Sequence, residues 1–493
     1  MKRLLLNVVF MTVILVAGAQ SVNGVIYADT MGVEVVKVWG THAERGYALG
    51  YLTGSRITDL IKNYIKPSFG PYYSVARGII TAGADIQIPT EYLTESQAVV
   101  EGMNAAGSNT EAFDQTDIVL ANSFLDVSNL LAKKGPGNGC STLMSWGDAT
   151  AGTDLNGKAV VSRHMDWTVN QVLYRNNSII VHFPSEPTET KWLLIGYSGM
   201  LSALSGANTS FSVFQQMMSD ANISGQHNKL YEPIWMTLRK ALESPDYNND
   251  GAANVQDIKS ALNERTTGFA DAYIITSMGI NNPVDSLVAM VAEIAPIAPT
   301  HTYRYNDFPD SIPGDNLYAA NNQIRRNNAM NFCNRYNGIR NNIGDGTMIS
   351  TERNWELMRD YSHQSNNMQF MLYAPETDLL RLSVYSSGKP AYQNDPVNFS
   401  LAELFEMPFT GFEETSSDNI QLYPVPAADK IIVNCITAGK YEAAIIDFNG
   451  RTVFSEKVNL PGSLSLPALH TGLYTLRLNS GKLLYTRKIS IHN

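Results

Sequence analysis

Hydrophobic and polar positions follow different periods in different parts of the chain. Between about residues 41 and 134, apolar residues recur at spacings of three and four, which predicts helices in HAERGYALGYLTGSRITDLIKNYI and LTESQAVVEGMNAAG. After residue 140 the pattern changes to short apolar runs that predict strands: KAVVSRHM, NSIIVHF, KWLLIGY, SFSVFQQM, DAYIITSM, SLVAMVAEIA, MQFMLYAP and LLRLSVYS. A helical stretch, EPIWMTLRKALES, interrupts them. Because strands that are apolar on both faces need a layer on each side, the pattern predicts a layered α+β domain.

The end of the chain has a pattern of its own. The polar, acidic stretch PFTGFEETSSDN separates two periodic regions, and we interpret residues 408–419 as a linker. Beyond it, IQLYPVPAADKIIVN, KYEAAIIDFNGRTVFSEKV and GLYTLRLNSGKLLYTRKISI alternate apolar and polar residues, with hairpin turns expected at Asn449-Gly450 and Ser480-Gly481. Residues 420–493 are therefore predicted to form a small β-domain.

The start of the chain resembles a secretory signal. Lys2 and Arg3 precede an apolar run from Leu4 to Val16, and small residues follow at Ala17–Ala19. The alternative, a membrane anchor, needs a run of roughly 20 apolar residues, which this run does not reach. We expect residues 1–19 to be a signal peptide and the mature chain to be exported, without a transmembrane segment.

Composition narrows the classes of partner. The chain has 493 residues, 44% of them hydrophobic, enough for a large core and more than one domain. Its formal net charge of −10 argues against nucleic acid and anionic membrane surfaces as partners. The three cysteines (Cys140, Cys333, Cys435) are too few for a disulfide scaffold, and their odd number leaves at least one thiol unpaired.

Cys140 stands out because of its position in the sequence. The stretch GNGCSTLMSWGDATAGTDLNGKAVVSRHMDW places it directly after a glycine-rich loop and ahead of a predicted strand that ends in Arg-x-x-Asp. A catalytic cysteine needs a nearby base or cation, and none of the eight histidines suggests a Cys-His pair. A cut between Gly139 and Cys140 would supply an α-amine with a pKa of about 7.7 to 8.0 on the same residue. A small core residue and a disulfide with Cys333 are the alternatives.

The same stretch resembles the N-terminal-nucleophile (Ntn) cysteine hydrolases of the choloylglycine hydrolase, acid ceramidase and isopenicillin N acyltransferase group. The family pattern falls on Cys140, Arg163 and Asp166, with an aromatic residue next. LYAANNQIRRNN resembles the segment that carries the family's catalytic asparagine, at Asn321, and CNRYNGIR resembles a later segment, at Arg335. The resemblance implies a four-layer αββα sandwich for residues 140–407 and a helical propeptide for residues 20–139.

The roles implied by this resemblance describe a self-cleaving amidohydrolase that acts on a linear carbon–nitrogen amide. Cys140 would attack the amide carbonyl, Arg163 would favour its thiolate, and Asp166 would hold the α-amine. Asn321 would stabilise the oxyanion, and Arg335 would form an ion pair or contact the substrate. An Arg163–Asp166 pair with a purely structural role is the alternative for those two residues.

One family position departs from the pattern. The family's second oxyanion-stabilising asparagine falls near Met217, where Gln215 and Gln216 are neighbours that can offer the same amide. No cofactor is implied for catalysis. An acyltransferase with the same acyl-enzyme is an alternative function, and a binding protein with an inactive Ntn-like fold is another.

The C-terminal segment also resembles a known family, the sorting domain of the type IX secretion system. The resemblance rests on four motifs: Tyr423-Pro-Val-Pro426, Asp429, Gly472-Leu-Tyr474 and Thr486-Arg-Lys488. It implies the secretion machinery as a partner and a secreted or cell-surface location. A carbohydrate-binding β-sandwich is the alternative.

A calcium loop is predicted within the α+β domain. DYNNDGAANVQD, residues 246–257, has the ligand order of a twelve-residue loop, with a glycine at position six and the helical stretch VQDIKSALNE after it. The predicted ligands are Asp246, Asn248, Asp250, Ala252 through its carbonyl, Asn254 and Asp257. A polar, solvated turn is the alternative.

Overall fold

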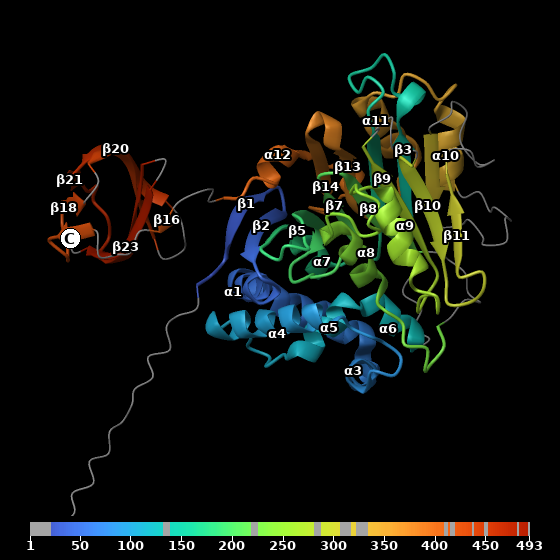
Figure 1. The fold of residues 1–493 in the computed structure, drawn as a ribbon, viewed down its shortest axis with the longest axis horizontal. Coiled ribbons are helices and arrows are strands. Elements are labelled where there is room, and N and C mark those ends of the chain that lie inside the picture. The colour runs from blue at the N-terminus through green and yellow to red at the C-terminus, as the bar shows by residue number, and fades with distance from the viewer. Residues whose placement is uncertain are drawn as a thin grey trace, which may run out of the picture. The chain divides into compact units, whose positions relative to one another are not determined.

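The computed structural model describes residues 21–131, 139–217, 225–280, 287–305, 317–321, 334–408, 413–414, 420–435, 438–447, 452–480 and 483–491. The chain divides into two compact units, residues 1–406 and 407–493 (Figure 1). The first unit mixes helices and sheets, and the second is built of strands.

The larger sheet of the first unit has nine strands, in the order β1 (Gly24–Thr30), β2 (Val33–Gly40), β5 (Asn177–Pro184), β6 (Trp192–Tyr197), β7 (Ser205–Asn208), β8 (Phe211–Met217), β9 (Tyr273–Gly279), β10 (Ala289–Ile294) and β11 (His301–Arg304). Neighbouring strands are antiparallel except β2 and β5, which pair in parallel from Glu34–Ser178 to Gly40–Pro184. Segments far apart in the sequence are therefore neighbours in one sheet.

The second sheet of this unit has six antiparallel strands, in the order β12 (Leu317–Asn321), β3 (Cys140–Ser145), β4 (Val160–Asp166), β13 (Asn367–Ala374), β14 (Leu379–Val384) and β15 (Val397–Phe399). Side chains join the two sheets. Gln216 Nε2 on β8 donates to Thr142 Oγ1 on β3 at 2.7 Å, and Gln369 Nε2 on β13 donates to Asn177 Oδ1 on β5 at 2.9 Å. Side chains of β3 and β13 thus face the nine-stranded sheet.

Helices cover both sheets. α1 (His42–Leu60), α8 (Ile234–Glu243) and α9 (Val255–Asn263) pack on strands of the nine-stranded sheet, while α10 (Asn334–Asn342) and α11 (Thr351–Tyr361) pack on the six-stranded one. Figure 1 shows α1 grouped with the other N-terminal helices. These are the π-helical turn η1 (Ile61–Ile65), α2 (Lys66–Phe69), α3 (Tyr73–Ala82), α4 (Thr90–Ala105), α5 (Gln115–Asn122) and α6 (Phe124–Leu130). Shorter helices are α7 (Gln171–Arg175) and α12 (Leu401–Leu404).

α1 and α4 approach each other closely because glycines face the contact. A Cβ atom at Gly50 would lie 2.0 Å from the carbonyl oxygen of Val99, and one at Gly102 would lie 2.1 Å from that of Tyr47. At such separations any side chain would force the two backbones apart. The glycine pair therefore sets the distance between the two longest helices of the N-terminal segment.

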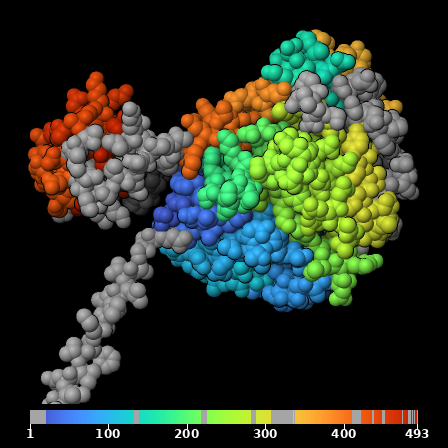
Figure 2. Space-filling model, viewed as in Figure 1, coloured from blue at the N-terminus to red at the C-terminus, as the bar shows by residue number. Residues whose placement is uncertain are grey.

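The predicted helices within residues 42–65 and 93–107 are present, as are the strands predicted after residue 140. The prediction of a helical N-terminal segment was incomplete, because this segment also supplies β1 and β2. β2 carries Glu34 and Lys37 among apolar residues, yet both are buried. Lys37 is satisfied there by the carbonyl oxygens of Glu403 and Glu406, partners that no local pattern indicates. Figure 2 shows the blue and light-blue N-terminal residues as a continuous part of the surface of the first unit.

The second unit contains a five-stranded and a three-stranded sheet. Their orders are β16 (Glu413–Glu414), β23 (Leu483–Ile491), β22 (Gly472–Asn479), β19 (Gly439–Ile446) and β20 (Thr452–Leu460), and β17 (Ile420–Tyr423), β18 (Lys430–Cys435) and β21 (Gly462–Ser465). Its own core includes Ile431, Tyr441 and Ile445. β19 pairs with β20 and β22 with β23, as the hairpin prediction requires. Gly450 and Gly481 of the predicted turns lie outside the described residues.

Candidate active site

Cys140 is the first residue of β3, a strand whose six residues are all buried. It is a free thiol with 4% of its surface exposed, and it pairs with Met165 of β4 across the antiparallel ladder. The alternative disulfide partner, Cys333, lies outside the described residues. The thiol is therefore held at the end of a central strand, on the face turned to the other sheet.

Arg163 on β4 reaches the sulfur of Cys140. Its Nη2 lies 3.4 Å from Cys140 Sγ and donates to the carbonyl oxygen of Gln215 at 2.8 Å, while Nη1 donates to Ser205 Oγ at 3.0 Å. Arg163 is fully buried, and in the described part of the chain no carboxylate forms an ion pair with it. Arg163 therefore places a buried positive charge beside the sulfur of Cys140, and its hydrogen-bond partners among the described residues are all neutral.

Asp166 ends β4 and pairs with Arg335 rather than with Arg163. Its Oδ2 lies 3.0 Å from Arg335 Nη2, and its Oδ1 accepts from Asn367 Nδ2 at 3.0 Å. Burial raises the pKa of Asp166 to about 6, although the guanidinium of Arg335 lowers it. The alternative of a direct Arg163–Asp166 pair is therefore not what the structure contains.

Arg335 also contacts the backbone just before Cys140. Its Nη2 donates to the carbonyl oxygen of Gly139 at 3.5 Å. A single guanidinium thus lies between the carboxylate of Asp166 and the peptide bond at which the sequence predicts a cut. The structure brings Cys140, Arg163, Asp166 and Arg335 together although they come from three separate segments.

Asn321 is placed only by its backbone. It is the last residue of β12 and pairs with Ser141, the neighbour of Cys140, across the sheet. Its side chain lies outside what the structure describes, so its role in oxyanion stabilisation stays a prediction.

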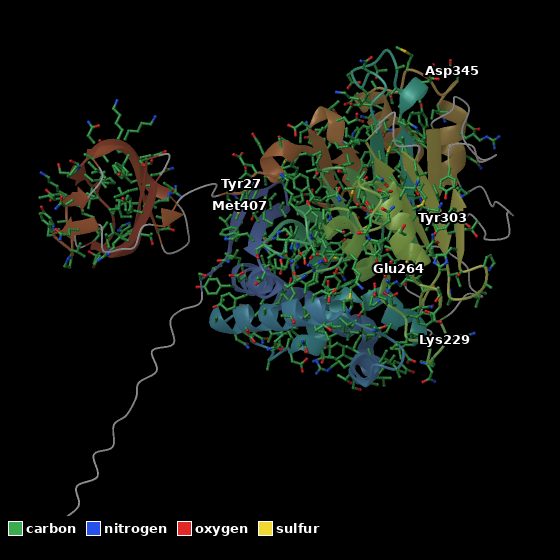
Figure 3. All side chains as sticks on the ribbon, in the orientation of Figure 1. Tyr27, Lys229, Glu264, Tyr303, Asp345 and Met407 are labelled. Atoms are coloured by element: carbon green, nitrogen blue, oxygen red, sulfur yellow. The ribbon has the colours of Figure 1, made fainter. Side chains whose placement is uncertain are left out.

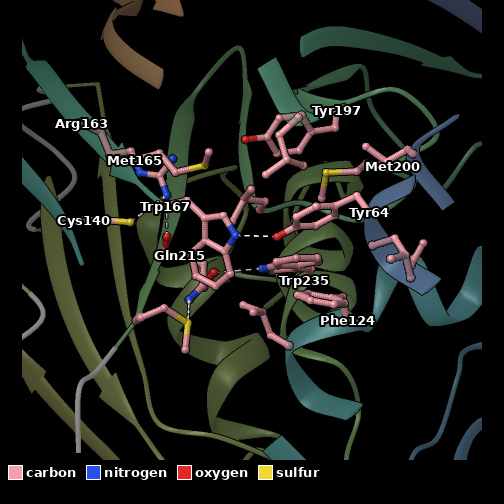
Figure 4. A pocket seen from close by; sticks show the side chains of 17 residues that line it. Tyr64, Phe124, Cys140, Arg163, Met165, Trp167, Tyr197, Met200, Gln215 and Trp235 are labelled. Atoms are coloured by element: carbon pink, nitrogen blue, oxygen red, sulfur yellow. Dashed lines mark hydrogen bonds between the residues drawn. The ribbon is translucent and has the colours of Figure 1, made fainter. Parts of the chain in front are cut away.

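An apolar pocket of about 80 Å³ adjoins Cys140 (Figure 4). The segment before Cys140 supplies one side of it, through Leu60, Tyr64, Ile65, Ala121, Phe124 and Leu125. Trp167, on the part of the lining that follows Cys140 in the chain, is linked to this side, because its Nε1 donates to Tyr64 Oη at 2.6 Å. Tyr64 lies in η1, and a π-helical turn at such a position is a frequent feature of functional sites. Sequence reasoning missed this contribution, since helical periodicity does not show which surface a buried face meets.

Gln215 faces this pocket, whereas Gln216 does not. Trp235 Nε1 donates to Gln215 Oε1 at 3.0 Å, which directs the Nε2 amide toward Met217 Sδ at 3.5 Å (Figure 4). Gln216 instead donates between the two sheets to Thr142 and Thr276. The alternation of side chains along β8 places residues 215 and 217 on one face. Of the two glutamines considered, Gln215 is therefore the one beside Cys140.

A buried charged cluster links the segment before Cys140 to the segment after it. His42 Nδ1 lies 2.7 Å from Glu95 Oε2, and His42 Nε2 lies 2.7 Å from Glu189 Oε1. Arg239 Nη2 donates to the same Glu95 at 2.7 Å. Burial alone lowers the pKa of His42, but Glu189 and Glu95 raise it to about 9. His42 is therefore a buried cation at neutral pH.

The same region contains the group of three potential metal ligands found among the described residues, His42, Glu186 and Glu189. Arg45 donates to Glu186 Oε2 at 3.0 Å and to Glu189 Oε2 at 2.8 Å. Because the two carboxylates already pair with two cations, Arg45 and the protonated His42, we interpret the group as an ion-pair network.

The predicted calcium loop is a compact turn before α9. Gly251 has a φ of +99°, and its N–H donates to Asp246 Oδ2 at 2.7 Å. Asp257 is fully buried and accepts from the backbone of Tyr247, Asn248 and Asn254. The Tyr247 hydroxyl donates to Glu264, just beyond α9, at 2.6 Å. Figure 3 labels Glu264 among the side chains of the first unit. Asp246, Asp250 and Asp257 do not bring three carboxylate oxygens within 4.8 Å of one another, so the calcium site stays a prediction.

Comparison with known proteins identifies the second unit. Residues 421–492 match the family model described as the secretion system C-terminal sorting domain. The tail is a type IX sorting domain. The protein is therefore exported through type IX secretion to the cell surface or the extracellular space, and the secretion machinery is a partner of this sorting domain. Within the described residues, no helix is both long enough and apolar enough to span a bilayer.

The rest of the chain has more distant similarities. Protein dcd1B of Dictyostelium discoideum is 25% identical over 251 residues, and the match spans 46% of this chain and 46% of that protein, about half the length of each. A mutant conjugated bile acid hydrolase from Clostridium perfringens matches as a structure with 11% identity and a TM-score of 0.32, over 56% of this chain and 97% of the other. A TM-score this low does not establish a shared fold.

Proposed function

We propose that this protein is an exported, self-cleaving cysteine amidohydrolase of the Ntn type, which acts on a linear carbon–nitrogen amide through a Cys140 acyl-enzyme. The observation that carries the proposal is the arrangement at the start of β3. The thiol lies beside the buried guanidinium of Arg163, and the carbonyl that precedes it accepts from Arg335. There, the Cys140 thiol lies close to the Arg163 guanidinium and to the Gly139 carbonyl, in a buried site.

Self-cleavage is the first reaction in this proposal. Cys140 sulfur attacks the carbonyl carbon of Gly139, and the donated hydrogen bond from Arg335 stabilises charge on the carbonyl oxygen. The carbon–nitrogen bond breaks as the thiol proton passes to the leaving nitrogen, which leaves a thioester and a free α-amine on Cys140. Water then hydrolyses the thioester to give a Gly139 carboxylate and to restore the thiol.

Turnover of an external amide then repeats the same chemistry. The α-amine of Cys140 takes the thiol proton and returns it to the leaving amine, since its ordinary pKa of about 7.7 to 8.0 suits both directions. Asp166 holds the protonated amine, and Arg163 favours the thiolate. The Gln215 amide, fixed by Trp235, and Asn321 are the proposed side-chain donors to the oxyanion, each worth on the order of 3 kcal/mol in comparable sites.

The segment before Cys140 stays with the enzyme after the cut. β2 lies inside the nine-stranded sheet and pairs with β5 over its length, so its loss would expose two strand edges. The cluster around His42 adds two buried ion pairs across the same boundary, His42–Glu189 and Arg239–Glu95. Removing one partner from such pairs costs about 3–5 kcal/mol, so dissociation is strongly disfavoured. We therefore expect a two-fragment enzyme.

A four-layer αββα core is the fold that we propose for residues 140–407. It is supported by α8 and α9 on the nine-stranded sheet and by α10 and α11 on the six-stranded one. The side-chain bonds of Gln216 and Gln369 between the sheets support the central pair of layers.

An acyltransferase is the second candidate, and the apolar pocket favours it. Its lining is almost free of unpartnered polar groups, so it holds few sites for ordered water. An acyl-enzyme that excludes water can pass its acyl group to an amine.

We also propose that the loop at residues 246–257 binds calcium. Three carboxylates, two amide oxygens and a backbone carbonyl are the oxygen donors that Ca²⁺ takes at such spacing. The φ of Gly251 supports the sharp turn at position six. The ion would neutralise the acidic loop and fix the start of α9, and it has no part in the catalytic proposal.

Fragment analysis tests the catalytic proposal. The purified chain should run as two fragments on a denaturing gel, with the larger one beginning at Cys140 by N-terminal sequencing. Cys140→Ala should stay uncut, while the matched control Cys435→Ala should be cut like the parent. An intact parent chain would argue for a binding protein, and a cut Cys140→Ala chain would point to an outside protease.

A further inference from the structure

We propose that Asn367 is a positioning residue for the self-cleavage reaction. Its side-chain amide fixes one oxygen of Asp166, so that the other oxygen holds Arg335 against the bond that is cut. The inference rests on the proposed function and adds to it a residue that the sequence motifs do not contain. Three observations carry it: a bulge in β13, the hydrogen bonds of the amide, and the contacts that lead from the carboxylate to the cut site.

A β-bulge in β13 brings Asn367 to Asp166. Gln369 pairs with Met165 across the antiparallel ladder. If the ladder were regular, Met368 would therefore lie opposite Asp166. The register instead shifts between Asn367 and Gln369, and Asn367 is the residue that pairs with Asp166. Bulges are frequent beside active sites because the extra residue re-aims a side chain. This bulge thus exchanges an apolar neighbour of the carboxylate for an amide.

The Asn367 amide is held in one orientation. Its Nδ2 carries two hydrogens, and its two shorter hydrogen bonds go to Asp166 Oδ1 at 3.0 Å and to the carbonyl oxygen of Gln369 at 2.9 Å. Its Oδ1 accepts from the backbone N–H of Tyr392 at 3.0 Å. The reverse orientation would bring the amide oxygen against two other oxygens. Because Asn367 has no exposed surface, its amide is fixed as a donor toward the carboxylate.

The two oxygens of Asp166 have separate partners. Oδ1 accepts from Asn367, and Oδ2 lies 3.0 Å from Arg335 Nη2. The same Nη2 donates to the carbonyl oxygen of Gly139. A carboxylate that is held at one oxygen cannot turn freely about its Cβ–Cγ bond, so Asn367 sets the direction in which Asp166 holds the guanidinium. Asn367 therefore acts on the reaction through Asp166.

The amide also favours the charged form of Asp166. Burial raises the pKa of this carboxyl to about 6, while Arg335, the Asn367 amide and Arg163 lower it. Burial lowers the pKa of His164, on the same strand, to about 3, so this imidazole stays neutral where Asp166 titrates. Loss of the amide donor should therefore raise the pKa of Asp166 and reduce its charged fraction near pH 6.

Rates of self-cleavage in the full chain test this assignment. Cell-free synthesis with a short labelling pulse provides the uncut chain, and a denaturing gel follows its conversion into two fragments at pH 6 and at pH 8. Asn367→Ala removes the amide and leaves a cavity, whereas Asn367→Leu removes the amide and fills the space. Both variants keep the thiol of Cys140, the other titratable group of the site.

The matched control is Asn354→Ala. Asn354 on α11 also has no exposed surface. It donates to Ser145 Oγ at 3.2 Å and accepts from Ser162 Oγ at 2.5 Å, so its loss also removes side-chain hydrogen bonds to β3 and β4. Ser145 ends β3, whereas Cys140 begins it. The control therefore perturbs the same sheet away from the cut site.

We expect both Asn367 variants to be cut about tenfold more slowly than the parent at pH 6. The deficit should be smaller at pH 8, where more of Asp166 is charged, and Asn354→Ala should be cut at the parental rate at both pH values. In an Asp166→Asn chain, the addition of Asn367→Ala should slow cleavage no further, because residues that act through one another are not additive. Urea unfolding of the same variants in Cys140→Ala chains shows which of them fold.

The other outcomes separate the inference from the function on which it rests. Cleavage of both Asn367 variants at the parental rate, a deficit that is equal at the two pH values, or an undiminished deficit in the Asp166→Asn chain would overturn the positioning role. Failure of both variants to fold, while Asn354→Ala folds, would assign Asn367 to the scaffold and overturn it as well. A parent chain that is not cut would instead remove the proposed function itself.

Discussion

Replacing Asp166 by asparagine separates a catalytic carboxylate from a structural one. The change keeps the shape of the side chain but removes its charge from a site with no exposed surface. Asp166 is the partner of Arg335, and Arg335 donates to the carbonyl of Gly139. If the carboxylate holds this guanidinium at the cut site, its loss should slow cleavage at the bond before Cys140.

The effect on stability can be worked out from the pKa of Asp166. Burial raises it to about 6 from an ordinary value of 3.8. An acid whose pKa is higher in the folded than in the unfolded state binds more protons when folded, so stability falls as pH rises between the two values. At 1.36 kcal/mol for each pKa step, the charged carboxylate costs about 3 kcal/mol above pH 6. The asparagine variant escapes this cost and should be the more stable protein at pH 7.5.

Urea unfolding measures this difference best in chains that cannot be cut. Cys140→Ala and Cys140→Ala/Asp166→Asn should have similar free energies of unfolding at pH 4, and the double variant should gain up to about 3 kcal/mol at pH 7.5. In a chain that keeps Cys140, Asp166→Asn should lower the rate of cleavage at the Gly139–Cys140 bond at least tenfold. This corresponds to about 1.4 kcal/mol in the activation free energy.

A structural role for Asp166 predicts the opposite result. Removal of the carboxylate would then strand the Arg335 cation, and the double variant should lose several kcal/mol at pH 7.5. That loss, together with cleavage at the parental rate, would refute the reasoning above. A gain in stability joined to slow cleavage is the pattern expected where activity is kept at the expense of stability.

Three further predictions concern the scaffold. Gly50→Ala should lose about 1–3 kcal/mol of unfolding free energy, because its Cβ would meet the carbonyl of Val99. The control Gly78→Ala in α3, with open space around it, should change stability little or raise it by up to about 1 kcal/mol. Urea unfolding compares the two variants, and equal effects would contradict the close α1–α4 contact. The ion pairs of His42 should contribute fully to the unfolding free energy below pH 6.5, and this contribution should be lost as pH rises through about 9. The parent should therefore lose about 3 kcal/mol of unfolding free energy between pH 6 and pH 10, a loss that His42→Gln does not show. Parallel curves of unfolding free energy against pH for the two proteins would contradict this. Asp250→Ala should lower the melting temperature only when calcium is present, because a ligand of the folded state stabilises by mass action; a parent melting temperature that chelator leaves unchanged would show that the loop binds no calcium.

Much of the secondary structure could be predicted from the sequence because periodicity is a local property. The three- and four-residue spacing in residues 42–65 describes one buried face of a helix, and the alternation in the tail describes strands with one buried face. The sorting domain could be recognised from short motifs for the same reason, since its turns and strands carry their own signals. Cys140 could be singled out because a glycine-rich loop, a cysteine and Arg-x-x-Asp lie within one short stretch.

Only the tertiary structure decided which distant residues meet. Local patterns show that a face is buried but not what covers it, because the partner is chosen by the packing of the whole domain. The parallel pairing of β2 with β5, the Asp166–Arg335 pair and the N-terminal side of the pocket all join segments that are far apart in sequence. The choice of Gln215 over Gln216 likewise depended on which face of β8 turned toward Cys140, and that was settled by the register of the sheet and by Trp235.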